Sequence, residues 1–179
     1  MSNQRNTNSI KKLKDALIEL LLERNYTDIS VSNIAKRAQV SRGTFYQHFL
    51  DKDDLANTIG EETSQKFRDI LSKGNLDKKE KILEAMEHIK MDFKHFKAIS
   101  QAPHVQFSNN VRKLLENIIT NNTMLKNKIK EYTKVPDDII IQAFCASFER
   151  VISSWIEDDL SDDPKDITDT LIKIERLFW

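Results

Sequence analysis

The segment SVSNIAKRAQVSRGTFYQHF, residues 30–49, carries a row of side chains that can hydrogen-bond to nucleic acid. Hydroxyl, guanidinium, amide and imidazole groups of this kind bind base edges and phosphate oxygens. No carboxylate lies between Ser41 and Leu50, so this row would not repel a phosphate backbone. The residues that we expect to face outward and contact DNA are Ser32, Arg42, Gly43, Thr44, Tyr46, Gln47 and His48.

The apolar residues of the same segment are spaced for two short helices joined by a tight turn. Ser30 can cap the first helix and Ser41 the second, because a serine hydroxyl accepts a hydrogen bond from a free amide of the first turn. Such a helix-turn-helix presents the polar face of its second helix to the major groove of DNA. The apolar positions that would hold the two helices together are Ile34, Ala35, Ala38, Val40, Phe45 and Phe49.

Each candidate contact residue has a chemical role that its side chain suggests. Arg42 is the best candidate for a base contact, because a guanidinium can bind both acceptors of a guanine and discriminate by about 1–3 kcal/mol. Gln47 can read adenine or bind phosphate, and Thr44 can meet a thymine methyl group. Ser32 and Ser41 are expected to bind phosphate. The alternative for each residue is a polar side chain that is only solvated.

From Ile10 to Leu55 the sequence resembles the DNA-binding domain of the TetR/AcrR family of one-component bacterial regulators. The resemblance covers an amphipathic first helix, the two motif helices, and DKDDL, which is similar to the family's F-x-x-K-x-x-L entry into a fourth helix. It implies that Tyr46, His48 and Lys52 contact the phosphate backbone.

Two residues depart from the family pattern at places where glycine is common. Gln39 ends the first motif helix, and Asn25 precedes the aromatic Tyr26. A residue other than glycine in a left-handed backbone conformation costs roughly 1 kcal/mol, and asparagine tolerates it better than glutamine. We expect local strain at these positions and no change of fold.

Composition favours an all-α chain. Three glycines and three prolines in 179 residues leave little room for the tight turns of a hairpin-rich sheet. Residues 1–50 hold eight lysines and arginines against four acidic residues, a balance of +4, which leaves −4 for the rest of a chain that is neutral overall. A basic head on an acidic body would orient the molecule over phosphate, although an asymmetry this small can also arise by chance.

We expect about nine helices in two domains. Residues 1–50 would form the DNA-binding domain, and residues 51–179 a domain for ligand binding and dimerisation. The polar stretch MSNQRNTNS before the first helix is expected to be mobile. The helices of the larger domain are expected at about 51–72, 78–100, 105–120, 123–132, 136–158 and 164–179.

The last two long helices carry more apolar residues than one core stripe requires, so we expect them to form a homodimer. The alternative is a helix buried inside a monomer. The resemblance implies the same dimer, since the family dimerises through these helices. The expected interface residues are Phe144, Phe148, Val151, Ile152, Trp155, Ile167, Leu171, Ile174 and Phe178.

Aromatic residues of the larger domain could line a cavity for a small-molecule effector, although side chains at this spacing also form cores. The candidates are Met91, Phe93, Phe96, Phe107, Phe144, Phe148 and Trp155. A metal site at His88, Asp92 and His95 is a minor alternative, because one helix face would carry all three. The single cysteine, Cys145, excludes an internal disulfide and is expected to be a packing residue.

The sequence therefore predicts a DNA-binding transcriptional regulator, with no catalytic residues, no metal and no cofactor. The mechanism implied by the resemblance is a dimeric repressor that binds a palindromic operator in double-stranded DNA and is released by an unknown small molecule. Activation and control by a protein partner stay open, as does a regulatory interaction protein that has lost DNA binding. Without a positively charged leader or a long apolar run, we expect a cytoplasmic protein and no membrane partner.

Overall fold

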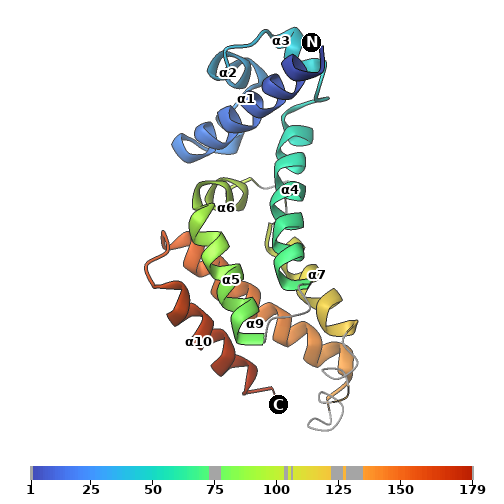
Figure 1. Cartoon of the computed structure of the whole chain (residues 1–179), viewed down its shortest axis with the longest axis vertical. Helices are drawn as coiled ribbons and strands as arrows, with labels where there is room; N and C mark the ends of the chain where they lie inside the picture. The colour runs from blue at the N-terminus through green and yellow to red at the C-terminus, as the bar shows by residue number, and fades with distance from the viewer. Residues whose placement is uncertain are drawn as a thin grey trace. The chain divides into compact units, whose positions relative to one another are not determined.

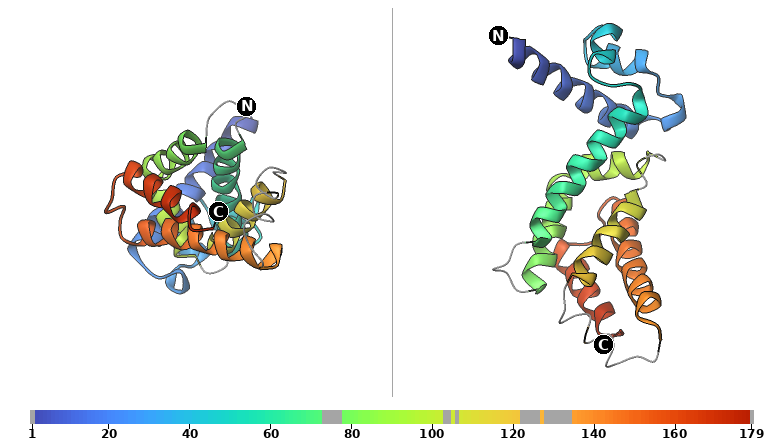
Figure 2. Two further views of the ribbon diagram at one scale, coloured as in Figure 1. Left: turned by 90° about the horizontal axis from the view of Figure 1, so that it is seen from below. Right: turned by 90° about the vertical axis from the view of Figure 1, so that its right-hand side faces the viewer.

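The computed structural model describes residues 2–72, 78–102, 105, 107–121, 127 and 135–178, and every regular element in these ranges is a helix (Figure 1). The all-α prediction is therefore confirmed. The chain divides into two compact units, Met1–Thr63 with Lys94–Phe107, and Ser64–Phe93 with Ser108–Trp179. Helix α4 (Lys52–Ser72) runs without interruption from the first unit into the second (Figure 2). The expected domain boundary at residue 50 stays a prediction.

The first unit is built on α1 (Ser2–Glu23), whose apolar stripe is buried as its helical spacing predicts. The helix begins at Ser2, so the expected mobile tail was wrong; no glycine or proline in residues 1–23 stops the helix. After α1 come the 3-10 turn η1 (Tyr26–Asp28), α2 (Val31–Arg37), α3 (Arg42–Tyr46) and, later in the chain, α6 (Phe93–Ser100).

Helix α2 packs on α1, and α3 packs on α2, with the predicted apolar positions buried. Ile34, Ala35 and Phe45 are almost fully buried, and Ala38 and Phe49 nearly so. The predicted caps are also present: the hydroxyl of Ser30 accepts from the amide of Asn33, and that of Ser41 accepts from the amide of Thr44. Local capping and apolar spacing thus suffice to place α3.

Polar contacts reinforce the junction between α1 and α2. The guanidinium of Arg37 binds both carboxylate oxygens of Glu23, at 2.8 and 2.7 Å, and donates to Glu19 at 3.1 Å. The hydrogen bond from Arg37 lowers the pKa of Glu23, and both carboxylates raise the pKa of Arg37. All three side chains are partly exposed, so we expect this cluster to orient α2 on α1 and to add little to the free energy of unfolding.

The turn between α2 and α3 is closed by a left-handed residue. Gln39 has a φ of 56°, the conformation that the family's glycine adopts without strain. Asn25 has a φ of −61° and an extended backbone, so the expected strain at that position was wrong. Only one of the two departures from the family pattern therefore has a conformational cost.

We predict that Gln39→Gly stabilises the protein by about 0.5–1 kcal/mol, because the left-handed penalty exceeds the extra chain entropy of glycine. Thermal unfolding should show a rise of roughly 2–4 °C in Tm. Gln39→Ala is the control: it removes the side chain, keeps the strained backbone and should not raise Tm. An equal rise in both variants would contradict backbone strain as the cause.

The second unit contains α5 (Lys78–Met91), α7 (Phe107–Thr120), α9 (Asp137–Glu157) and α10 (Pro164–Glu175). Helices α5 and α10 lie side by side and run in opposite directions (Figures 1 and 2). Ion pairs join Lys78 to Glu175 at one end and Lys90 to Asp163 at the other. Asp163 is the N-cap residue of α10 and its carboxylate accepts from the backbone amide of Lys165 at 3.0 Å, so its pair with Lys90 joins the start of α10 to the end of α5.

The helix expected at 78–100 is two helices in the structure, since Asp92 interrupts it between α5 and α6. Neither glycine nor proline marks this break, so the sequence pattern gave no sign of it. The metal alternative at His88, Asp92 and His95 required one continuous helix face and fails for that reason. Across the described ranges, no group of three or more metal-ligating side chains occurs. The helix expected at 123–132 lies outside the described residues.

Candidate DNA-binding interface

The second motif helix, α3, presents a short polar surface. Arg42, Gly43, Tyr46 and Gln47 are exposed, and Thr44 is half-buried. Ser41, at its start, is exposed as well, although its hydroxyl already accepts from the amide of Thr44 at 3.0 Å and lies 2.9 Å from the Thr44 hydroxyl. The structure therefore brings these predicted contact residues together on one face. Ser32 is exposed on the preceding helix α2.

Arg42 and Tyr46 lie close together on α3. The guanidinium carbon of Arg42 is 6.0 Å from the centre of the Tyr46 ring, at the outer limit of a cation–π contact. The ring of Tyr46 in turn packs edge-on against Phe45, which is fully buried. Tyr46 is 52% exposed while its ring contacts the buried Phe45, so both Tyr46 and Arg42 are accessible at the surface of α3.

Gly43 is not required by packing within the chain. A β-carbon at this position would lie 3.5 Å from the Ser41 hydroxyl oxygen, an ordinary van der Waals distance. Gly43 has no positive φ either. A need for glycine here would therefore come from something outside the chain that approaches the backbone closely, as the DNA groove would.

His48 does not offer both ring nitrogens to DNA. Its Nε2 is buried and has no hydrogen-bond partner among the described residues, and the ring lies edge-on to that of Phe49. The expected phosphate contact cannot use this nitrogen in the observed rotamer. His48 is half-buried, so its expected phosphate contact would have to use the other ring nitrogen and stays a prediction.

Lys52 has a structural role that the resemblance did not imply. Its ammonium donates to the backbone carbonyls of Tyr26 and Ile29, both at 2.8 Å, and lies 4.2 Å from the centre of the Tyr26 ring. Two of its three N–H groups are therefore used within the chain. These bonds hold the start of α4 to η1 and leave one N–H group of Lys52, so its expected phosphate contact stays a prediction.

A second contact joins the same two segments. The hydroxyl of Tyr26 donates to the carboxylate of Asp53, and burial together with this bond raises the pKa of Tyr26. We call Tyr26, Ile29, Lys52 and Asp53 the α4 clamp. Sequence reasoning missed Tyr26 and Asp53, because they lie 27 residues apart in the chain and no local pattern pairs them.

The residues expected to line an effector cavity are divided between the two units. Phe96 and Phe107 pack edge to face in the first unit, with ring centres 6.1 Å apart, whereas Phe144, Phe148 and Trp155 are buried in the second. Phe93 is half-buried. Met91 is 83% exposed, so its expected place in a cavity was wrong: the end of α5 leaves it on the surface.

The expected dimer residues are also divided by burial. Six of them are at most 7% exposed within the single chain and cannot supply much surface to a partner: Phe144, Phe148, Ile152, Trp155, Ile167 and Leu171. For these the interface prediction was wrong, because α9 turns that face toward α10 and the rest of its own unit. Val151, Ile174 and Phe178 are half-buried and stay candidates, and Ile139 adds an apolar side chain that is 53% exposed.

Helix α9 is long and apolar enough to cross a membrane by length and composition. Half of its most apolar window is nevertheless buried within the chain, which is typical of the core helix of a folded domain. Trp155 also indicates a core helix, since its indole N–H donates to the backbone carbonyl of Asp162 in the turn that leads to α10.

Cys145 lies in this core with no exposed surface, and burial raises its pKa to about 12. Because only the thiolate is nucleophilic, we predict that Cys145 reacts with iodoacetamide at pH 8 at least 10³-fold more slowly than a free thiol, whose pKa is about 8.5. Labelling followed by mass spectrometry should show modification only after unfolding in urea. Rapid modification of the native protein would contradict the packing role.

Two family models match the sequence that forms these units. The model described as bacterial regulatory proteins of the tetR family matches residues 13–59, and that described as a transcriptional regulator C-terminal region matches residues 77–175, more than half of the chain. The chain belongs to the TetR family. The helix-turn-helix described above lies within the first match, to the model of bacterial regulatory proteins.

Two curated relatives of this TetR-family chain come from Bacillus subtilis. The HTH-type transcriptional regulator YwcC is 28% identical over 146 residues, which are 82% of this chain and 57% of YwcC. The fatty acid metabolism regulator protein is 38% identical over 53 residues, which are 30% of this chain and 27% of that protein. The chain thus spans less than two thirds of the length of these relatives.

Solved structures share the TetR fold over nearly the whole chain. A TetR transcriptional regulator from Streptococcus agalactiae superposes with a TM-score of 0.74 at 19% identity, covering 97% of this chain and 96% of that one. NalD, the secondary repressor of the MexAB-OprM multidrug efflux pump in Pseudomonas aeruginosa, gives 0.72 at 18% identity with the same coverage. FadR from Bacillus subtilis in complex with stearoyl-CoA gives 0.63 at 19% identity, covering 94% and 97%.

Proposed function

We propose that this TetR-family regulator is a dimeric repressor that reads a palindromic operator through α3 and is released from it by a small molecule bound in the larger domain. The observation that carries the DNA-reading part is the capped helix α3, with Arg42, Gly43, Tyr46 and Gln47 exposed on one face and Phe45 buried on the other. Donor groups presented in this way match the acceptors of the major groove.

The dimer is part of the proposal because one α3 is too short to select a DNA sequence alone. Five residues of helix reach few base pairs, so useful specificity needs two copies that bind half-sites about one helical turn apart. The apolar side chains left for a partner include Ile139 and Val151 on α9, Ile174 on α10, and Leu177 and Phe178 after it. In this proposal residues 1–50 read DNA, residues 51–179 bind the ligand and the partner subunit, and the protein works in the cytoplasm.

Release by a ligand requires that the ligand bind one conformation of the regulator better than the other. Helix α4 is the covalent link through which a change in the larger domain would reach the α4 clamp and α3. A repressor of an efflux pump and a regulator in complex with an acyl-CoA among the similar structures support a small-molecule effector as the class.

The test combines binding-site selection with sedimentation. Selection of the full-length protein on randomised duplexes should enrich an inverted repeat, and analytical ultracentrifugation should give the mass of two chains. Enrichment of an inverted repeat by a protein that sediments as a single chain would refute the dimer. No enrichment of any sequence would favour the alternative, a regulatory interaction protein of the same fold that has lost DNA binding.

A further inference from the structure

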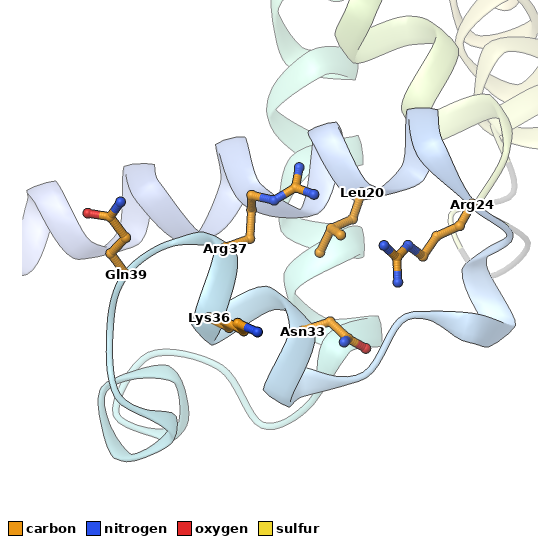
Figure 3. Close-up of a pocket in the computed structure, with 6 residues that line it drawn as sticks. All are labelled: Leu20, Arg24, Asn33, Lys36, Arg37 and Gln39. Atoms are coloured by element: carbon orange, nitrogen blue, oxygen red, sulfur yellow. The ribbon is translucent and has the colours of Figure 1, made fainter.

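A hollow of about 420 Å³ lies between α1 and α2 in the first unit. Six residues line it (Figure 3): Leu20, Arg24, Asn33, Lys36, Arg37 and Gln39. None of them belongs to the set of residues expected to contact DNA. We propose that this hollow binds a phosphoryl group, carried either by the DNA backbone or by a free phosphate ester.

The polar lining of the hollow consists of groups that can donate hydrogen bonds. The side-chain oxygen of Asn33 accepts two hydrogen bonds from Ser30, one from its backbone amide at 2.9 Å and one from its hydroxyl at 2.6 Å. The two side-chain N–H groups of Asn33 can therefore donate to a ligand. Gln39 adds a second side-chain amide, and Leu20, only 2% exposed, forms an apolar wall. A ligand with several acceptor oxygens suits such a lining.

The charges at the hollow favour an anion. Glu19 and Glu23 carry two negative charges, of which Arg37 balances one; with Arg24 and Lys36 the five groups have a net charge of +1. Arg24 has a single contact with Glu23, at 3.9 Å, and its side chain is 42% exposed. Lys36 is exposed and forms no ion pair with any residue that the structure describes. Arg24 and Lys36 are therefore available to an oxyanion from two sides of the hollow.

The position of Lys36 favours the DNA backbone as the source of the phosphate. Lys36 follows Ser32 by four residues, so both lie on the same face of α2, one turn apart. A phosphodiester strand that reaches Ser32 would therefore pass Lys36 and the hollow. This source depends on the proposed DNA-reading function, whereas a free phosphate ester does not.

The first arm of the test measures binding to a duplex of arbitrary sequence at several salt concentrations. The variant Arg24→Gln/Lys36→Gln should bind about 10-fold more weakly at low salt, with a slope of log K against log[salt] that is smaller by about 1. The control Lys113→Gln/Lys173→Gln removes two exposed lysines from the second unit and should leave both quantities unchanged.

The second arm titrates the protein with pyrophosphate in the absence of DNA, followed by calorimetry and by ³¹P line broadening. A smaller salt slope in the hollow variant alone supports a backbone phosphate, and saturable pyrophosphate binding lost in that variant alone supports a free ester. No difference from the control in either arm would overturn the proposal. Neither arm requires that the protein prefer a DNA sequence. A failed binding-site selection would therefore count against the proposed function without affecting the test of the phosphate site.

Discussion

Replacing Arg42 by alanine should lower affinity for the selected operator by about 30-fold or more, and flatten the preference at one guanine position in each half-site. The reason is the loss of a bidentate contact worth about 1–3 kcal/mol per half-site. Arg42 is exposed at the start of α3, so its removal leaves the fold intact. Binding-site selection repeated with the variant, together with fluorescence anisotropy on single-base substitutions, measures both effects.

The matched control for that substitution is Arg42→Lys. Lysine keeps the positive charge but cannot reproduce the planar pair of N–H groups, so it should restore non-specific binding and not the base preference. A uniform loss on every sequence in Arg42→Ala, fully rescued by lysine, would show that Arg42 contacts phosphate and that another residue reads the base.

Replacing Lys52 by methionine should destabilise the protein by about 2–3 kcal/mol. The substitution keeps the length of the side chain but removes two hydrogen bonds from a charged donor and leaves the carbonyls of Tyr26 and Ile29 without it. Urea unfolding followed by circular dichroism measures the loss. Lys12→Met, at an exposed position of α1, is the control and should change stability by less than about 0.5 kcal/mol.

The same variant separates two roles for Lys52. If the α4 clamp is its function, the folded fraction of Lys52→Met should bind non-specific DNA with the salt slope of the native protein. If Lys52 also contacts phosphate with its third N–H group, the salt slope of the folded fraction should fall by about 1 in addition to the loss of stability. The second outcome would support the role that the family resemblance implies.

Much of the first unit could be predicted from the sequence because its determinants are local. Ser30 and Ser41 cap helices within three residues of themselves, and the apolar spacing of Ile34 and Phe45 defines a buried face without reference to distant segments. The left-handed turn at Gln39 is local as well. Helix spacing, capping and the lack of carboxylates on α3 therefore predict the helix that we propose reads DNA.

Tertiary structure alone decided which side chains remain free to act. The sequence shows Lys52 as a cation next to the motif, but only the fold places its ammonium on two carbonyls from the segment before α2. Apolar residues of α9 looked alike in the sequence, and only packing distinguished the buried Phe144 and Trp155 from the exposed Ile139. The hollow at Arg24 and Lys36 joins residues of two helices in the same way. Helix periodicity and capping depend on near neighbours, so the sequence alone determined the family and the helix that we propose reads DNA. Burial and hydrogen bonding between distant segments depend on the whole fold, so only the tertiary structure decided which side chains remain exposed and unpaired by other segments.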